Sequence, residues 1–213
     1  MQSMQLISGL VSNNAAKVRM VLAEKGVEYE TVEVPWTKEN AWEPKPDILK
    51  TSNPREQVPV LVDGDLTLWD STVINEYLEE KFPTPALFAN DLKTKALIRL
   101  WEDEGDHNQA HVGVLIQEVF LAEPGAALSE AGQKAQAALA QFVTRIDSQL
   151  GEDDYLCREF SVADISVFLT LAFGVTLGVQ LDSDKVSAWY QRVLERPAIK
   201  AEFEAMMAGV AAL

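Results

Sequence analysis

The chain has 213 residues, of which 47% are apolar, which is enough for one large domain or two small ones with a buried core. Its 33 acidic residues outnumber its 18 Lys and Arg residues, and the resulting net charge of −15 repels phosphate backbones and anionic membranes. Nucleic acid and membrane partners are therefore not expected. The N-terminus lacks a secretory signal pattern, and the single cysteine, Cys157, has no intrachain partner, so we expect a cytoplasmic protein.

The first 83 residues predict alternating strands and helices. In chain order the patterns indicate a strand at 5–8, a helix at 14–25, a strand at 29–34, a short helix near 46–50, a hairpin within 57–69 and a helix after Ser71. This order, β-α-β-α-β-β-α, predicts a small mixed sheet flanked by helices.

The remainder of the chain predicts helices alone. Phe82-Pro83-Thr84-Pro85 ends the first region, and the helical patterns that follow span 91–121, 129–150, 161–177, 185–194 and 197–207. Ser161 and Asp164 have the spacing of a capping box at the start of one of these helices. We therefore expect an α/β domain at residues 1–83 and an all-helical domain at residues 90–213.

The hairpin opens on a proline. Val58, Val60 and Val62 alternate with Pro59 and Leu61, and Asp63-Gly64-Asp65 supplies turn chemistry. Proline cannot donate to a strand ladder, so Pro59 is expected at the start of the strand, after a cis Val58-Pro59 bond. The amide and carbonyl of Val58 would then point outward, where an extended peptide ligand can pair with them.

Asp70 and Ser71 follow the hairpin, at the point where a strand gives way to a helix. The free amides of a helix start suit a carboxylate, and the Asp70 side chain suits an ammonium group. A purely structural interpretation is that either residue is only the N-cap of the helix.

Together, these residues resemble the thioredoxin-like domain of the glutathione transferase superfamily. In that family a cis Val-Pro pairs with the cysteinyl backbone of glutathione, and an acidic residue plus Ser hold its γ-glutamyl end; Asp70-Ser71 stands here for the usual Glu-Ser. Residues 160–166, FSVADIS, and residues 189–199, WYQRVLERPAI, resemble two motifs of the family's helical domain. The resemblance implies the family's fold, glutathione as co-substrate and a homodimer.

The resemblance also implies a thiol donor between the first strand and the first helix. Counting back five residues from Lys17 in the family-like Lys-Val pair gives Ser12, which would donate to the glutathione thiolate, with Asn14 as a second donor. The alternative is that Ser-Asn-Asn before a helix is ordinary capping composition.

Disulfide exchange through an enzyme thiol is disfavoured, because residues 8–16 contain no cysteine. For the same reason the segment lacks the Ser-Ser-Cys signature of the maleylacetoacetate isomerase branch. Cys157 is expected to be a packed small side chain rather than a nucleophile.

Other residues of the ligand site follow from the resemblance. Gln57 matches the position that binds the glycyl end of glutathione, and Lys45 is a candidate for its carboxylate. Glu56 stands where the commoner motif has Gly, and it adds negative charge near an anionic ligand. Trp36 and Trp42 are expected either to edge the cleft or to pack.

His107 and His111 lie four residues apart on a predicted helix, a spacing that can hold a metal, but spacing identifies no third ligand, so we expect no metal site. In the family this helix lines the second-substrate cleft and the dimer interface. Asp103 or Asp106 is a candidate to reach the partner subunit's glutathione.

The sequence is thus interpreted as a glutathione transferase that joins the glutathione thiolate to a small apolar electrophile or reduces a peroxide, with the electrophile left open. The alternative is a non-enzymatic scaffold of the same fold, like the stringent starvation proteins or the transferase-like domain of elongation factor 1 gamma. Val58-Pro59, Asp70-Ser71 and Ser12 argue against a scaffold, whereas Glu56 and the acidic surface leave it open.

Overall fold

The computed structural model describes residues 4–123 and 125–213. Contacts within the chain define two compact units, one made of the residues up to Ala86 together with Arg196–Leu213 and the other of Leu87–Glu195. The last helix therefore clusters with the first unit, although the sequence groups it with the other helices of region 90–213. The domain boundaries at residues 83 and 90 stay a prediction.

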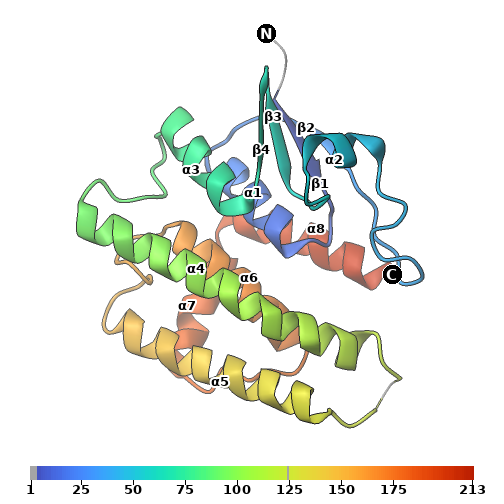
Figure 1. The fold of residues 1–213 in the computed structure, drawn as a ribbon. Coiled ribbons are helices and arrows are strands. Elements are labelled where there is room, and N and C mark those ends of the chain that lie inside the picture. Colours follow the sequence, from blue (N-terminus) through green and yellow to red (C-terminus); the bar gives the residue numbers. More distant parts are fainter. Residues whose placement is uncertain (1–3, 124) are drawn as a thin grey trace. The chain divides into compact units, whose positions relative to one another are not determined.

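The first unit contains a four-stranded sheet with the strand order β2-β1-β3-β4, as Figure 1 shows. The strands are β1 (Gln5–Ser8), β2 (Glu30–Glu33), β3 (Val60–Asp63) and β4 (Leu66–Trp69). β1 pairs in parallel with β2 and antiparallel with β3, which forms a hairpin with β4. The predicted mixed sheet and hairpin are confirmed, and the hairpin turn contains Gly64 in the left-handed region, at φ 65°.

Helices α1 (Asn13–Glu24), α2 (Asp47–Ser52), α3 (Ser71–Lys81) and α8 (Pro197–Ala211) complete this unit. Leu49 of α2 packs on a core of Ile7, Val34 and Val60. α3 packs against α1 and the β3-β4 hairpin, and α8 packs against α1. The predicted order β-α-β-α-β-β-α is confirmed, and it places the start of α1 beside the carboxyl end of β1.

The second unit is built from α4 (Leu92–Leu115), the π-helical turn η1 (Ile116–Phe120), α5 (Glu130–Leu150), α6 (Val162–Thr176) and α7 (Asp184–Leu194). α4 packs against both α5 and α6, and α7 packs against α5 and α6. α6 is buried from Val162 to Gly174 because it is apolar on all sides. The helices that the sequence predicts in this region are confirmed.

The predicted capping box at the start of α6 is confirmed. Asp164 is fully buried, and its carboxylate accepts the N–H groups of Leu156 and Ser161, both at 3.0 Å, and the indole N–H of Trp189 at 2.8 Å. Burial raises the pKa of Asp164 to about 6, although these hydrogen bonds oppose the shift. The carboxylate thus ties the start of α6 to α7 and to the preceding loop.

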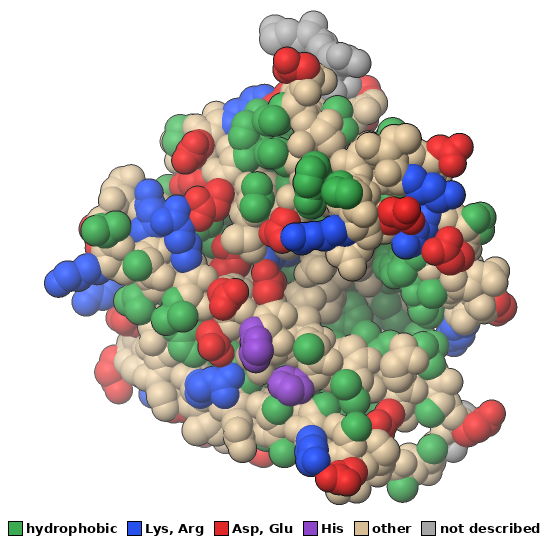
Figure 2. All heavy atoms as spheres, viewed as in Figure 1, with side chains coloured by type: hydrophobic (Ala, Val, Ile, Leu, Met, Phe, Trp, Pro, Cys, Tyr) green, Lys and Arg blue, Asp and Glu red, His purple; other side chains and the backbone are tan. Residues whose placement is uncertain are grey.

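Acidic side chains are spread over the face drawn in Figure 2 rather than gathered in one patch. Among the residues described, no helix combines the length and apolar character needed to cross a membrane. Cys157 is buried, and its burial, with the nearby charge of Asp164, raises the pKa of its thiol to about 12. A thiol with this pKa is protonated at neutral pH, in agreement with a packing role.

Candidate active site

A cavity of about 300 Å³ lies in the first unit, beside the start of α1. Three segments far apart in the sequence line it: the β1-α1 loop with the first turn of α1, the stretch from the end of β2 to α2, and the turn before β3. The lining contains five of the predicted site residues, namely Ser12, Asn14, Lys45, Gln57 and Val58. The other lining residues are Val34, Trp42, Leu49 and Glu56.

Ser12 is the N-cap of α1, and its hydroxyl oxygen accepts the N–H of Ala15 at 3.3 Å. This is the capping role that the sequence offers as an alternative to catalysis. The cap uses only the oxygen, because the hydroxyl proton has no acceptor among the described residues, so Ser12 can still donate into the cavity. Asn14, in the first turn of α1, is exposed on the same cavity.

The Val58-Pro59 peptide bond is cis, as the sequence predicts. β3 begins at Val60, so the backbone of Val58 lies outside the strand ladder and at the cavity. The turn before it is fixed by the buried side chain of Asn53, whose amide donates to the carbonyl of Gln57 at 2.7 Å. The Asn53 side chain therefore fixes the backbone of Gln57 at the cavity, directly before Val58.

Lys45 does not face the cavity as a free cation. Its Nζ lies 3.4 Å from a carboxylate oxygen of Glu56 and 3.6 Å from one of Glu43. Glu56 has φ 51°, in the left-handed region that glycine adopts without strain, which gives a physical reason for the Gly of the commoner motif. Glu56 thus strains the backbone and partly neutralises the predicted carboxylate-binding residue.

Asp70 and Ser71 are not among the residues that line this cavity. Asp70 is the N-cap of α3, where its Oδ1 accepts the N–H of Thr72 at 3.1 Å, and its side chain is partly exposed. Its Oδ2 lies 3.7 Å from a guanidinium nitrogen of Arg55. Asp70 therefore caps α3 through Oδ1, and its Oδ2 makes only the long ion pair with Arg55. Ser71 is buried.

Trp42 forms one wall of the cavity and packs on the β1-α1 loop. A Cβ at Gly9 would lie 2.3 Å from its ring, so only glycine fits there. Trp42 thus fulfils both roles that the sequence leaves open, whereas Trp36 is not a lining residue.

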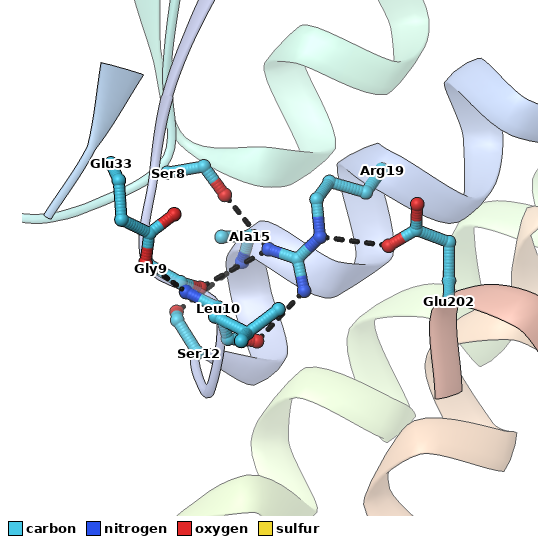
Figure 3. A network of polar contacts seen from close by, with 8 residues as sticks. All are labelled: Ser8, Gly9, Leu10, Ser12, Ala15, Arg19, Glu33 and Glu202. Carbon is cyan, nitrogen blue, oxygen red and sulfur yellow. Dashed lines mark hydrogen bonds and ion pairs between the residues drawn. The ribbon is translucent and has the colours of Figure 1, made fainter. Parts of the chain in front are cut away.

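The β1-α1 loop is fixed by a polar network that sequence analysis missed (Figure 3). Arg19 of α1 donates to the carbonyls of Gly9 and Leu10, at 3.1 and 2.8 Å, and the N–H of Leu10 donates to Glu33 at 2.9 Å. The only signal in the sequence is the position of Arg19 next to the Lys-Val pair. Its partners in the loop, the carbonyls of Gly9 and Leu10, are backbone groups, which no residue pattern reveals.

His107 and His111 lie on α4, and the described residues contain no group of three or more His, Cys, Asp or Glu that could hold a metal. The histidines are purple on the face drawn in Figure 2. Asp106 accepts the hydroxyl of Ser166 at 3.2 Å within its own unit, whereas Asp103 is exposed. A role for either aspartate at a dimer interface stays a prediction.

Comparisons with known proteins identify the family of this chain. A family model described as the N-terminal domain of glutathione S-transferase matches residues 11–81, the region that contains the whole cavity lining. A probable glutathione S-transferase, GSTF1 of Oryza sativa subsp. japonica, is 31% identical over 202 residues, which cover 89% of this chain and 90% of that protein. A stringent starvation protein A homolog of Coxiella burnetii is also 31% identical over 202 residues, with 93% and 90% covered.

Solved structures share the fold. The theta class glutathione S-transferase of Xanthomonas axonopodis pv. citri, solved with glutathione bound, has a TM-score of 0.83 at 24% identity and covers 95% of this chain and 97% of that one. Because relatives above 30% identity span nearly the whole chain and the family model matches the part with the cavity, this chain belongs to the glutathione transferase superfamily.

Proposed function

We propose that this protein is a glutathione transferase whose catalytic donor is Ser12. Glutathione is its co-substrate. The observation that carries the proposal is the single cavity that gathers Ser12, Asn14, Lys45, Gln57 and Val58 from three separate segments. These residues lie up to 46 positions apart between Ser12 and Val58, so local capping alone does not account for their convergence.

The reaction requires a thiolate, and an unperturbed thiol with a pKa near 8.5 is only a few per cent ionised at neutral pH. The Ser12 oxygen accepts from Ala15, which leaves its proton to donate to the glutathione sulfur. The partial positive charge at the start of α1 favours the thiolate further, and Asn14 supplies a second donor. The sulfur electron pair then attacks the electrophilic carbon, and the leaving group departs with the bonding electrons.

The remaining residues hold the tripeptide. The exposed backbone of Val58, set by Pro59, pairs with the cysteinyl unit, and Gln57 with Lys45 holds the glycyl end. At the other end, the Oδ2 of Asp70, which forms only a long ion pair with Arg55, binds the ammonium group, and Ser71 contributes to the γ-glutamyl carboxylate site at the start of α3. Positioning and thiolate stabilisation together supply the catalysis.

The proposal extends to the substrate and the setting. The second substrate is a small apolar electrophile. With a hydroperoxide, the thiolate would attack the peroxide oxygen to give an alcohol and a sulfenic acid, which a second glutathione converts to the disulfide and water. We place the enzyme in the cytoplasm as a homodimer with a detoxifying role, as membership of the glutathione transferase superfamily implies. The net charge of −15 disfavours nucleic acid and anionic membranes as partners.

A second candidate function is an interaction scaffold of the same fold. The ion pair between Lys45 and Glu56 favours it, because this pair reduces the positive charge offered to glutathione. The similarity to the Coxiella burnetii homolog supports the same alternative. A scaffold does not need the free hydroxyl of Ser12, so the two functions differ in a measurable way.

Retention on glutathione-agarose, with elution by free glutathione, tests the proposal. The protein should bind, elute with glutathione and conjugate an aryl halide. Asp70→Ala should elute earlier than the native protein. A native protein that flows through the column and has no conjugating activity would favour the scaffold.

A further inference from the structure

Arg19 is a buried cation whose contacts converge on the β1-α1 loop, which carries Ser12. One guanidinium nitrogen donates to the Ser8 hydroxyl at 2.7 Å and to the Gly9 carbonyl, and another donates to the Leu10 carbonyl. Figure 3 shows the guanidinium facing the loop. Arginine is charged at any physiological pH, so these are charge-assisted hydrogen bonds, which are shorter and stronger than neutral ones.

The counter-charge for Arg19 comes from the last helix. Glu202 of α8 accepts the Nε–H of Arg19 at 2.9 Å, and the two side chains are only 24% and 6% exposed. A buried guanidinium without a partner is strongly unfavourable, so Glu202 fixes both the charge balance and the orientation of Arg19. The planar guanidinium transmits this orientation to the loop, because its Nε side faces Glu202 and its terminal nitrogens face the loop carbonyls.

A second contact between α8 and the loop is independent of charge. A Cβ added at Gly209 of α8 would lie 2.7 Å from the Leu10 side chain and 3.3 Å from that of Val11. Gly209 is helical, so its absent side chain is explained by the loop residues that occupy the space rather than by its backbone conformation. α8 therefore supports the loop at two points, through Glu202 and through Gly209.

We propose that α8 positions the Ser12 hydroxyl for catalysis, with Arg19 and Glu202 as positioning residues that do not touch the substrate. This proposal rests on the proposed function of Ser12 as the thiol donor. Small displacements matter at such a site, since an error of about 1 Å in a catalytic group can lower the rate about 100-fold. Loosening α8 from the loop should therefore affect the thiolate more than the affinity for glutathione.

The test uses two conservative variants and a matched control. Glu202→Gln removes the counter-charge at constant shape, and Gly209→Ala pushes on Leu10 while favouring the helix. Glu204→Gln is the control, because Glu204 lies on the same helix α8 and its carboxylate forms an exposed ion pair with Lys200 at 3.9 Å, away from Arg19. Each full-length protein is examined by amide hydrogen exchange without ligand, by titration of the bound glutathione thiolate in the ultraviolet, and by kcat and KM with an aryl halide.

Both α8 variants should exchange the amides of residues 10–12 faster, raise the pKa of the bound thiol and lower kcat about 10-fold, with KM for glutathione changed less than about 3-fold. Glu204→Gln should match the native protein in all three. Thiol pKa and kcat values that equal the native ones in both α8 variants would overturn this inference alone. A native protein that leaves the thiol pKa of glutathione unchanged would overturn the proposed function and this inference with it.

Discussion

Among the helices that have a serine as N-cap, α1 and α6 place that serine in opposite surroundings. Ser161 starts α6 and is 2% exposed, and both its N–H and its hydroxyl donate to the buried Asp164 carboxylate. Ser12 starts α1 at the cavity, and its oxygen accepts from Ala15 while its proton has no acceptor in the described part of the chain. Helix capping is common to both, so it does not separate a structural serine from a catalytic one.

The two serines differ in the acceptor to which the hydroxyl group donates its proton in a hydrogen bond. At Ser161 the proton is used inside the protein, and the contact is closed to any ligand. At Ser12 the cap needs only the oxygen, so capping and donation to a thiolate are compatible. The comparison predicts that changes around Ser161 affect stability, whereas changes around Ser12 affect chemistry.

The largest effect is expected at Asp164. Asp164→Ala leaves buried donors of Leu156, Ser161 and Trp189 without an acceptor, and each loss costs about 1–3 kcal/mol. We expect the free energy of unfolding to fall by about 4–5 kcal/mol in urea titrations. Ser12→Ala, measured in parallel, should lose about 1 kcal/mol or less. Equal losses in the two variants would break the comparison.

The pH dependence of stability sharpens the same contrast. Burial raises the pKa of Asp164 to about 6 from the ordinary 3.8, so between about pH 4 and pH 6 the folded state keeps a proton that the unfolded chain releases. The unfolded state then binds fewer protons, so this group makes the protein less stable as pH rises through that window, by up to about 3 kcal/mol.

Asp164→Asn removes this titration. The difference in unfolding free energy between the native protein and Asp164→Asn should therefore change across the window, and urea titrations at pH 4, 5, 6 and 7 measure it. A difference that stays constant with pH would show that Asp164 does not titrate there.

The sequence predicts the elements around residues 57–81 well, because the signals are local: Pro59 at the strand start, Gly64 in the turn and Asp70 at the helix start all act within a few residues. The placement of α8 was not predictable in this way. Glu202 and Arg19 are 183 positions apart in the sequence, and an ion pair between residues so far apart leaves no periodic pattern in the sequence. The sequence indicates that Glu56 adds negative charge near the ligand, but its ion pair with Lys45 is known only from the folded turn.

The N-cap of α3, Asp70, tests whether a partly exposed capping side chain also binds the ligand. Asp70 caps α3 with one oxygen, as Asp91 caps α4 by accepting the N–H of Thr94 at 2.9 Å. Asp70→Ala should weaken glutathione binding by about 1–3 kcal/mol in calorimetric titrations, because it removes the partner of an ammonium group. Asp91→Ala, the matched control, should lose a similar helix cap and bind glutathione unchanged. Unchanged binding in Asp70→Ala would remove Asp70 from the site.

The smallest effect is expected at Glu56, another residue that lines the cavity. Glu56→Gly relieves a residue at φ 51° and removes one of the two carboxylates paired with Lys45, which leaves Lys45 more available to the glycyl carboxylate. Stability should therefore rise by about 1 kcal/mol and glutathione affinity by a few-fold. Glu56→Gln removes the charge alone and should give the gain in affinity without the gain in stability. The gain should shrink at high salt, which screens this partly exposed pair. A loss of affinity in both variants would mean that Glu56 itself contacts the ligand.

The most direct test of the account is the pKa of the bound glutathione thiol, followed by thiolate absorbance against pH in the native protein, Ser12→Ala and Ser12→Thr. The native protein should hold this pKa below the free value of about 8.5, and Ser12→Thr, which keeps a hydroxyl, should stay close to it. Ser12→Ala should raise the pKa and lower turnover with an aryl halide by about 100-fold, with glutathione affinity nearly intact. Coincident titration curves and equal turnover in the native protein and Ser12→Ala would show that Ser12 is only a helix cap.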